Sequence, residues 1–121
     1  MTDENTKTGR SVADCLPSDF AARAYKHFAK ALRKHPRFAD AMHGYESPGM
    51  VRGHLVACRE IINSKRKCSR VFATDLLECE LLEAWCAPNE QDTIDELYDA
   101  VAVLMRMIAV VEGKQRLGGE A

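Results

Sequence analysis

Hydrophobic residues recur along most of the chain three or four positions apart, which is the spacing of an α-helix. No stretch alternates convincingly between apolar and polar positions, so no β-strand is predicted. A first helix is expected over residues 20–34, because capping residues precede an amphipathic run that Pro36 ends. A second helix is expected from Pro48, with Ser47 as its cap, and its apolar positions extend to Ile62.

Two further helices follow in the second half of the chain. The third is expected over about residues 69–87, after a polar and basic break at 63–70, and it ends before Pro88. The fourth is expected over about residues 90–112, with Gly113 as its C-terminal stop.

The predicted fold is therefore all-α, a bundle of about four helices in a single domain at residues 17–113. Residues 1–16 are expected to form a disordered or loosely attached arm, and residues 114–121 a frayed tail. Between Ile94 and Val111 the last helix is apolar on nearly every side, and one short chain cannot cover all of these sides. We therefore expect oligomerisation to complete the bundle, as a dimer or a tetramer.

Two acidic pairs with i,i+3 spacing stand on the third and fourth predicted helices, with twelve residues between them. The pairs are Glu80 with Glu83, and Glu96 with Asp99, and each pair shares one helix face. On a helix with about 100° per residue, both pairs head stripes that continue as small or apolar residues. Solvated surface acids do not account for this pattern. Glu78 points about 160° away from Glu80 and is not expected to join the group.

A cation is expected between these acids. If the two helices form an antiparallel hairpin, the four carboxylates converge, and such a group is too costly without a positive charge. Oxygen donors favour a hard cation, Mg²⁺ with Mn²⁺ as the alternative, and the absence of Glu-x-x-His disfavours a di-iron redox centre. The sequence thus predicts a metal site at Glu80, Glu83, Glu96 and Asp99.

The charge balance and the cysteines indicate which kinds of partner and which compartment to expect. The 121 residues include 17 basic and 18 acidic side chains, for a formal net charge of −1, so stable nucleic-acid binding is not expected. No apolar run of about 18 residues is present, and the polar N-terminus lacks the apolar core of a secretory signal. The five cysteines are odd in number and form no CxxC motif, which is typical of reduced thiols. These features predict a cytoplasmic protein without a membrane partner.

The spacing of the acidic pairs also carries a family resemblance. The arrangement Glu80-x-x-Glu83, twelve residues, Glu96-x-x-Asp99 resembles the signature of the all-α nucleoside triphosphate pyrophosphohydrolases, the MazG-like group. In that signature EExxE precedes ExxD on consecutive helices. The resemblance covers about residues 69–112.

The chain departs from the signature at one position. The first glutamate of EExxE is Cys79 here, which bears on activity and on the number of ions bound. The stretch at 35–40 also looks like upstream sequence in phage-type members of the family.

The resemblance implies a Mg²⁺-dependent hydrolase of nucleotide metabolism that forms homo-oligomers. It would hydrolyse a nucleoside or deoxynucleoside triphosphate between the α and β phosphates, giving a monophosphate and pyrophosphate. Glu80 or Glu83 is expected to orient or deprotonate the attacking water. The basic residues expected to bind the phosphates are Lys65, Lys67, Arg70 and Arg106. The alternatives for these residues are a solvated connection at 63–70 and an inter-subunit salt bridge at Arg106.

Two other functions remain open from the sequence. A catalytically silent relative, a helical nucleotide-binding or assembly module, would keep the fold, and Cys79 supports that interpretation. A structural helical oligomer would instead pair the acids with basic residues, such as Arg70 or Arg106, from another subunit.

Overall fold

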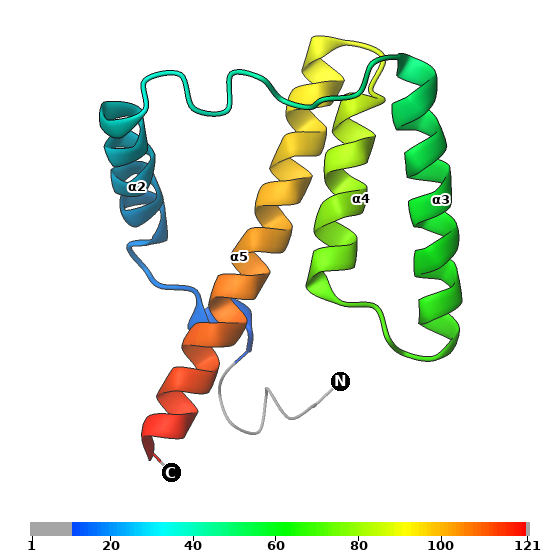
Figure 1. Cartoon of the computed structure of the whole chain (residues 1–121). Helices are drawn as coiled ribbons and strands as arrows, with labels where there is room; N and C mark the ends of the chain where they lie inside the picture. The colour runs from blue at the N-terminus through cyan, green and yellow to red at the C-terminus, as the bar shows by residue number, and fades with distance from the viewer. Residues whose placement is uncertain (1–10, 121) are drawn as a thin grey trace. The chain divides into compact units, whose positions relative to one another are not determined.

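The computed structural model describes residues 11–120, with side chains placed as far as Lys114. Within this range every regular element is a helix, so the predicted all-α class is confirmed (Figure 1). The elements are a short 3-10 helix η1 at Ala13–Cys15 and four α-helices, α2 at Phe20–Lys34, α3 at Pro48–Lys67, α4 at Ala73–Trp85 and α5 at Glu90–Glu120.

The first two α-helices begin where the sequence predicts. The bounds of α2 match the expected range, and His35, which lies before Pro36 with a non-helical φ of −138° and ψ of 83°, ends it. At the start of α3 the Ser47 hydroxyl accepts a hydrogen bond from the backbone N–H of Met50 at 3.2 Å, and Pro48 occupies the first turn. This cap satisfies a donor that the helix leaves unpaired.

The predicted polar break at 63–70 is wrong in its position. Helix α3 continues through Lys67, because Lys and Arg are good helix formers and their charges complement the negative end of the helix dipole. The chain turns only at Cys68 and Ser69, where Ser69 adopts a left-handed φ of 55°.

Helix α4 also starts later than expected, at Ala73. Its first turn is closed by Asp75, whose carboxylate accepts a hydrogen bond from the backbone N–H of Phe72 at 2.8 Å. The Lys65 ammonium donates to the other oxygen of Asp75 at 2.8 Å. The end of α3 is therefore tied to the beginning of α4.

The predicted stop at Gly113 is also wrong, since α5 runs through that residue to Glu120. The glycine has a packing role instead: a Cβ at Gly113 would lie 3.1 Å from the Sγ of Cys15, which is buried. Residues 1–10 of the predicted arm, and the side chains of 115–121 in the predicted tail, lie outside the described residues.

The described chain divides into two compact units. One comprises His43–Met107, and the other combines the chain up to Met42 with α5 from Ile108 onward. The predicted single domain at 17–113 stays a prediction.

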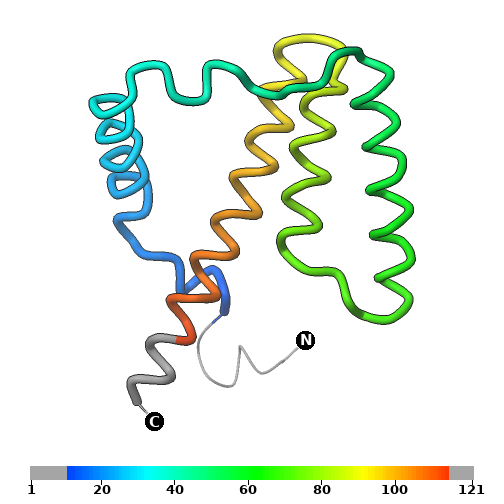
Figure 2. The backbone as a smooth tube through the Cα atoms, in the orientation of Figure 1, coloured from blue at the N-terminus to red at the C-terminus, as the bar shows by residue number. Residues whose placement is uncertain are grey.

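The His43–Met107 unit is organised by an antiparallel pair of helices, α3 and α4 (Figure 2). Residues one helical turn apart on α3 meet a residue of α4 to form the buried core. The members of this core are Val51, Leu55, Cys58, Ile62 and Leu82. A turn through Pro88 and Asn89 then leads into α5, and the side chain of Asn89 accepts a hydrogen bond from the N–H of Asp92 at 2.8 Å.

The other unit contains α2, which carries an apolar face that is largely exposed. Phe28 has ring contacts with Tyr25 and Phe38, with centroids 6.2 Å apart in both cases. Arg23 of α2 lies 4.0 Å from Glu112 of α5.

A search of the described helices finds none that is both long enough and apolar enough to cross a membrane.

Candidate functional site

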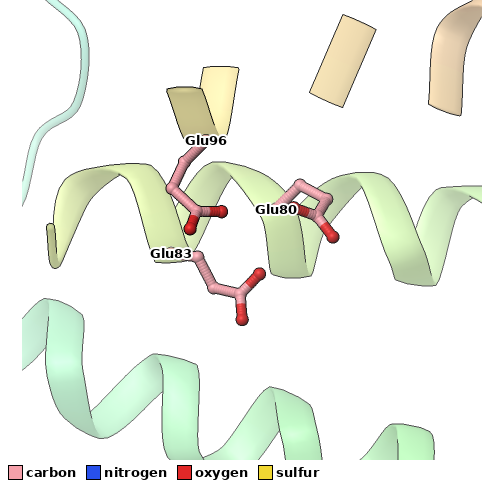
Figure 3. A group of neighbouring side chains, drawn as sticks. All are labelled: Glu80, Glu83 and Glu96. Atoms are coloured by element: carbon pink, nitrogen blue, oxygen red, sulfur yellow. The ribbon is translucent and has the colours of Figure 1, made fainter. Parts of the chain in front are cut away.

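Three carboxylates from two helices meet in the His43–Met107 unit. Glu80 and Glu83 extend from α4 and Glu96 extends from the start of α5 (Figure 3). One oxygen from each lies within 4.8 Å of the others. The i,i+3 spacing places the first two on one face of α4, and the tight turn at Pro88 and Asn89 brings the third onto it.

Burial and mutual repulsion both favour the protonated form of the carboxyl groups in this cluster. Burial, together with the charges of Glu83, Asp99 and Glu96, raises the pKa of Glu80 to about 7. Burial and the neighbouring charges of Glu83 and Asp99 also raise the pKa of Glu96. Both shifts have the causes expected of partly buried carboxylates that lie close together.

Asp99 lies beside the three carboxylates rather than among them. It is exposed, and a side-chain hydrogen bond joins it to Glu96. Its charge also acts on Glu80. Of the four predicted ligands, the structure thus brings three directly together and places the fourth next to them.

Arg59 of α3 is the basic residue at the site, and the sequence reasoning missed it. Its Nη2 donates to Oε2 of Glu83 at 2.7 Å, and the two side chains are 53% and 25% exposed. This hydrogen bond, more than any other contact, raises the pKa of the Arg59 guanidinium. A signal was present in the sequence, because Arg59, Asn63 and Arg66 have i,i+4,i+7 spacing and share one face of α3.

The two residues that precede Glu80 both contact α3, and Cys79 also borders a pocket that Glu80 and Glu83 line. Glu78 lies with its Oε2 3.6 Å from Nε2 of His54, in agreement with the angle expected from the sequence. Cys79 packs against the hydrophobic core, and burial is the main cause of its raised thiol pKa. The departure from the EExxE signature therefore falls at the α3–α4 interface.

The basic residues expected to bind phosphate lie elsewhere. Lys65 is engaged with Asp75 and sits 5.9 Å from the ring centroid of Phe72. Lys67, Arg70 and Arg106 are exposed. Arg106 is about 15 Å along α5 from Glu96, at about 1.5 Å per residue.

Two pockets adjoin the acidic group, and both are lined by Arg59 and Glu83. The larger, of about 520 Å³, also has Arg52 and acidic residues from the start of α5, and we call it the acidic pocket. The smaller, of about 310 Å³, adds Asn63, Arg66 and Glu80, and we call it the basic pocket.

Comparisons of the chain with protein-family models, with curated proteins and with solved structures gave no match.

Proposed function

We propose that this protein is a Mg²⁺-dependent nucleoside triphosphate pyrophosphohydrolase of the MazG-like kind. The observation that carries the proposal is the meeting of Glu80, Glu83 and Glu96, from two consecutive helices, within 4.8 Å. The reaction is inferred from the spacing of the acidic pairs, which resembles the family's signature. The expected homo-oligomer belongs to the same proposal.

The residues present fit a divalent cation. All three side chains offer carboxylate oxygens, the donors that Mg²⁺ and Mn²⁺ prefer, and no soft donor is in the group. After burial, the next causes of the raised pKa values of Glu80 and Glu96 are neighbouring carboxylates, whose negative charge a cation would offset. Glu80, Glu83 and Glu96 would hold the ion, with Asp99 close enough to add its charge.

When bound, the cation supplies positive charge that favours phosphate oxygens and offsets the charge that develops during hydrolysis. The chain supplies the proton acceptor. Glu80 and Glu83 on α4 are both candidates for the carboxylate that accepts a proton from the attacking water.

The second candidate function is a catalytically silent module with the same fold. Cys79 favours it, because this position is packed against the core and adds no carboxylate. Such a module would bind a nucleotide without cleaving it.

The decisive experiment incubates the protein with Mg²⁺ and a panel of nucleoside and deoxynucleoside triphosphates, and measures pyrophosphate release. Release with at least one nucleotide, lost in Glu96→Gln and in Glu80→Gln, is the expected result. Glu78→Gln is the matched control, since it removes a neighbouring carboxylate that faces α3. Binding without turnover supports the silent module, and equal turnover in all three variants refutes the carboxylate assignment.

A further inference from the structure

The α3 helix presents a row of polar and cationic groups to the acidic group. Arg59, Asn63 and Arg66 line the basic pocket together with Glu80 and Glu83. They lie on one face of α3, within about two turns of one another. No acidic residue of α3 lines this pocket.

The two pockets differ in the charge that a ligand would meet. The acidic pocket sets Arg52 and Arg59 against Glu83, Asp92, Asp95 and Glu96. The basic pocket sets two guanidiniums and an amide against two carboxylates, those of Glu80 and Glu83. A chain of phosphates is therefore repelled less in the basic pocket.

We propose that the basic pocket is a polyphosphate-binding site in which Arg59 is the principal anion-binding group, with Arg66 and Asn63 beside it. The planar guanidinium of arginine matches phosphate oxygens bidentately. In the structure the Arg59 guanidinium donates a hydrogen bond to the Glu83 carboxylate, at 2.7 Å. If Glu83 served as a ligand of the proposed cation, Arg59 would be free to bind the phosphates, and the two ligands would support each other's binding.

This inference deepens the proposed function, on which its Mg²⁺ part rests, and it replaces the phosphate contacts expected at the end of α3. It makes Arg59 a substrate-binding residue rather than a counter-charge for Glu83. The two roles differ in their effect on metal affinity. If Arg59 only balances the charge of Glu83, its removal changes the metal site alone. If Arg59 binds phosphate, its removal leaves the metal site able to bind a cation.

The test titrates the full-length protein with inorganic tripolyphosphate, with and without Mg²⁺, and separately with Mn²⁺ alone. Arg59→Ala is expected to weaken tripolyphosphate binding in Mg²⁺ by about tenfold or more, the loss of a charge-assisted contact. Its Mn²⁺ affinity is expected to equal or exceed that of the unmodified protein. Arg66→Ala loses less, and Arg59→Lys, which keeps the charge without the fork, falls between.

Arg33→Ala is the matched control, since it removes an exposed arginine of α2 that lines neither pocket. Circular dichroism of each variant verifies its helix content. The proposal is overturned if the unmodified protein binds no tripolyphosphate, if Arg59→Ala binds it normally, or if Arg33→Ala or Lys67→Ala loses as much as Arg59→Ala. A parallel loss of Mn²⁺ affinity in Arg59→Ala also overturns it.

The outcomes separate this proposal from the enzymatic one. If a nucleotide is cleaved while Arg59→Ala binds tripolyphosphate normally, the inference fails and the enzyme assignment stands. If tripolyphosphate binding depends on Arg59 but no nucleotide is cleaved, the enzyme assignment fails and the inference stands.

Discussion

Glu80 has a carboxyl group whose protonation changes near neutral pH. Its ordinary pKa of 4.5 is raised to about 7 by burial and by three neighbouring acids. Between these two values the folded chain retains a proton that the unfolded chain releases. The protonation of Glu80 therefore makes the free energy of unfolding fall as pH rises, whereas a salt-bridged acid makes it rise with pH.

The first prediction concerns this linkage. As pH rises from about 4.5 to about 7, the free energy of unfolding without divalent cations is expected to fall, because the unfolded state binds fewer protons than the folded state. Melting temperatures at about pH 5 and about pH 8 measure the effect. Adding Mg²⁺ is expected to raise the melting temperature more at the higher pH, where Glu80 is ionised.

Glu80→Gln is the control for this prediction, since the amide cannot titrate. The variant is expected to flatten the pH dependence across the same window. An unchanged slope in Glu80→Gln would assign the effect to another group.

The sequence predicts the positions of the clustered carboxylates better than it predicts Arg59, their basic partner. Helical angles placed Glu80, Glu83 and Glu96 correctly because all three depend on one local hairpin. Arg59 could not be paired with Glu83 from spacing alone. That contact depends on the register between α3 and α4, which side-chain packing at the interface decides.

At the scale of elements, α3 is the helix on which the core and the basic pocket both depend. Its cap, its buried stripe and its arginine face lie on a single helix. Changes that shorten or shift α3 are therefore expected to disturb stability and ligand binding together.

The second prediction addresses the cap. Ser47→Ala removes the hydroxyl that accepts from the N–H of Met50, and it is expected to lower the free energy of unfolding by about 1 kcal/mol. Urea unfolding followed by circular dichroism measures the loss. Ser47→Asp keeps an acceptor and is expected to retain most of the stability. An equal loss in both variants would count against the capping role.

The third prediction addresses the core of the α3–α4 pair. Leu55 is 5% exposed, so Leu55→Ala is expected to cost about 2–5 kcal/mol through lost burial and the cavity left behind. Val56, the next residue on α3, is 51% exposed, and Val56→Ala is expected to change stability by less than about 0.5 kcal/mol. Similar losses from both variants would show that the buried stripe is misassigned.

The errors in the predicted helix boundaries have physical reasons. The basic residues at the end of α3 suggested a break, yet they are good helix formers at the end of the helix that favours cations. Gly113 suggested a stop because glycine is common after helices, but here its missing side chain leaves room for Cys15. The end of α3 therefore follows local preferences that the charge pattern obscured, whereas the role of Gly113 depends on Cys15, a neighbour distant in the chain.

At the scale of the whole molecule, apolar side chains remain exposed along α5 from Ile94 onward. Four of them lie within the His43–Met107 unit, and they are Ile94, Tyr98, Val101 and Leu104. A water-exposed stripe of this kind is typical of helices that pack against another subunit.

The fourth prediction is that the protein self-associates through this stripe. Analytical ultracentrifugation is expected to give a dimer or a tetramer. Val101→Lys places a charge in the stripe and is expected to shift the protein toward monomer. Ala102→Lys, on an exposed position off the stripe, is the control and is expected to leave the assembly unchanged. A monomeric unmodified protein would refute the prediction.

The short turn at Pro88 and Asn89 has a consequence for the order of events during synthesis. All three clustered carboxylates lie between Glu80 and Glu96, so they come together by closing one small loop, which costs little entropy. Contacts this local form early in folding. As the chain leaves the ribosome, the three carboxylates can meet once Glu96 and its first helical turn have emerged. The residues of the proposed cation site are therefore all present before the remainder of α5 has been made.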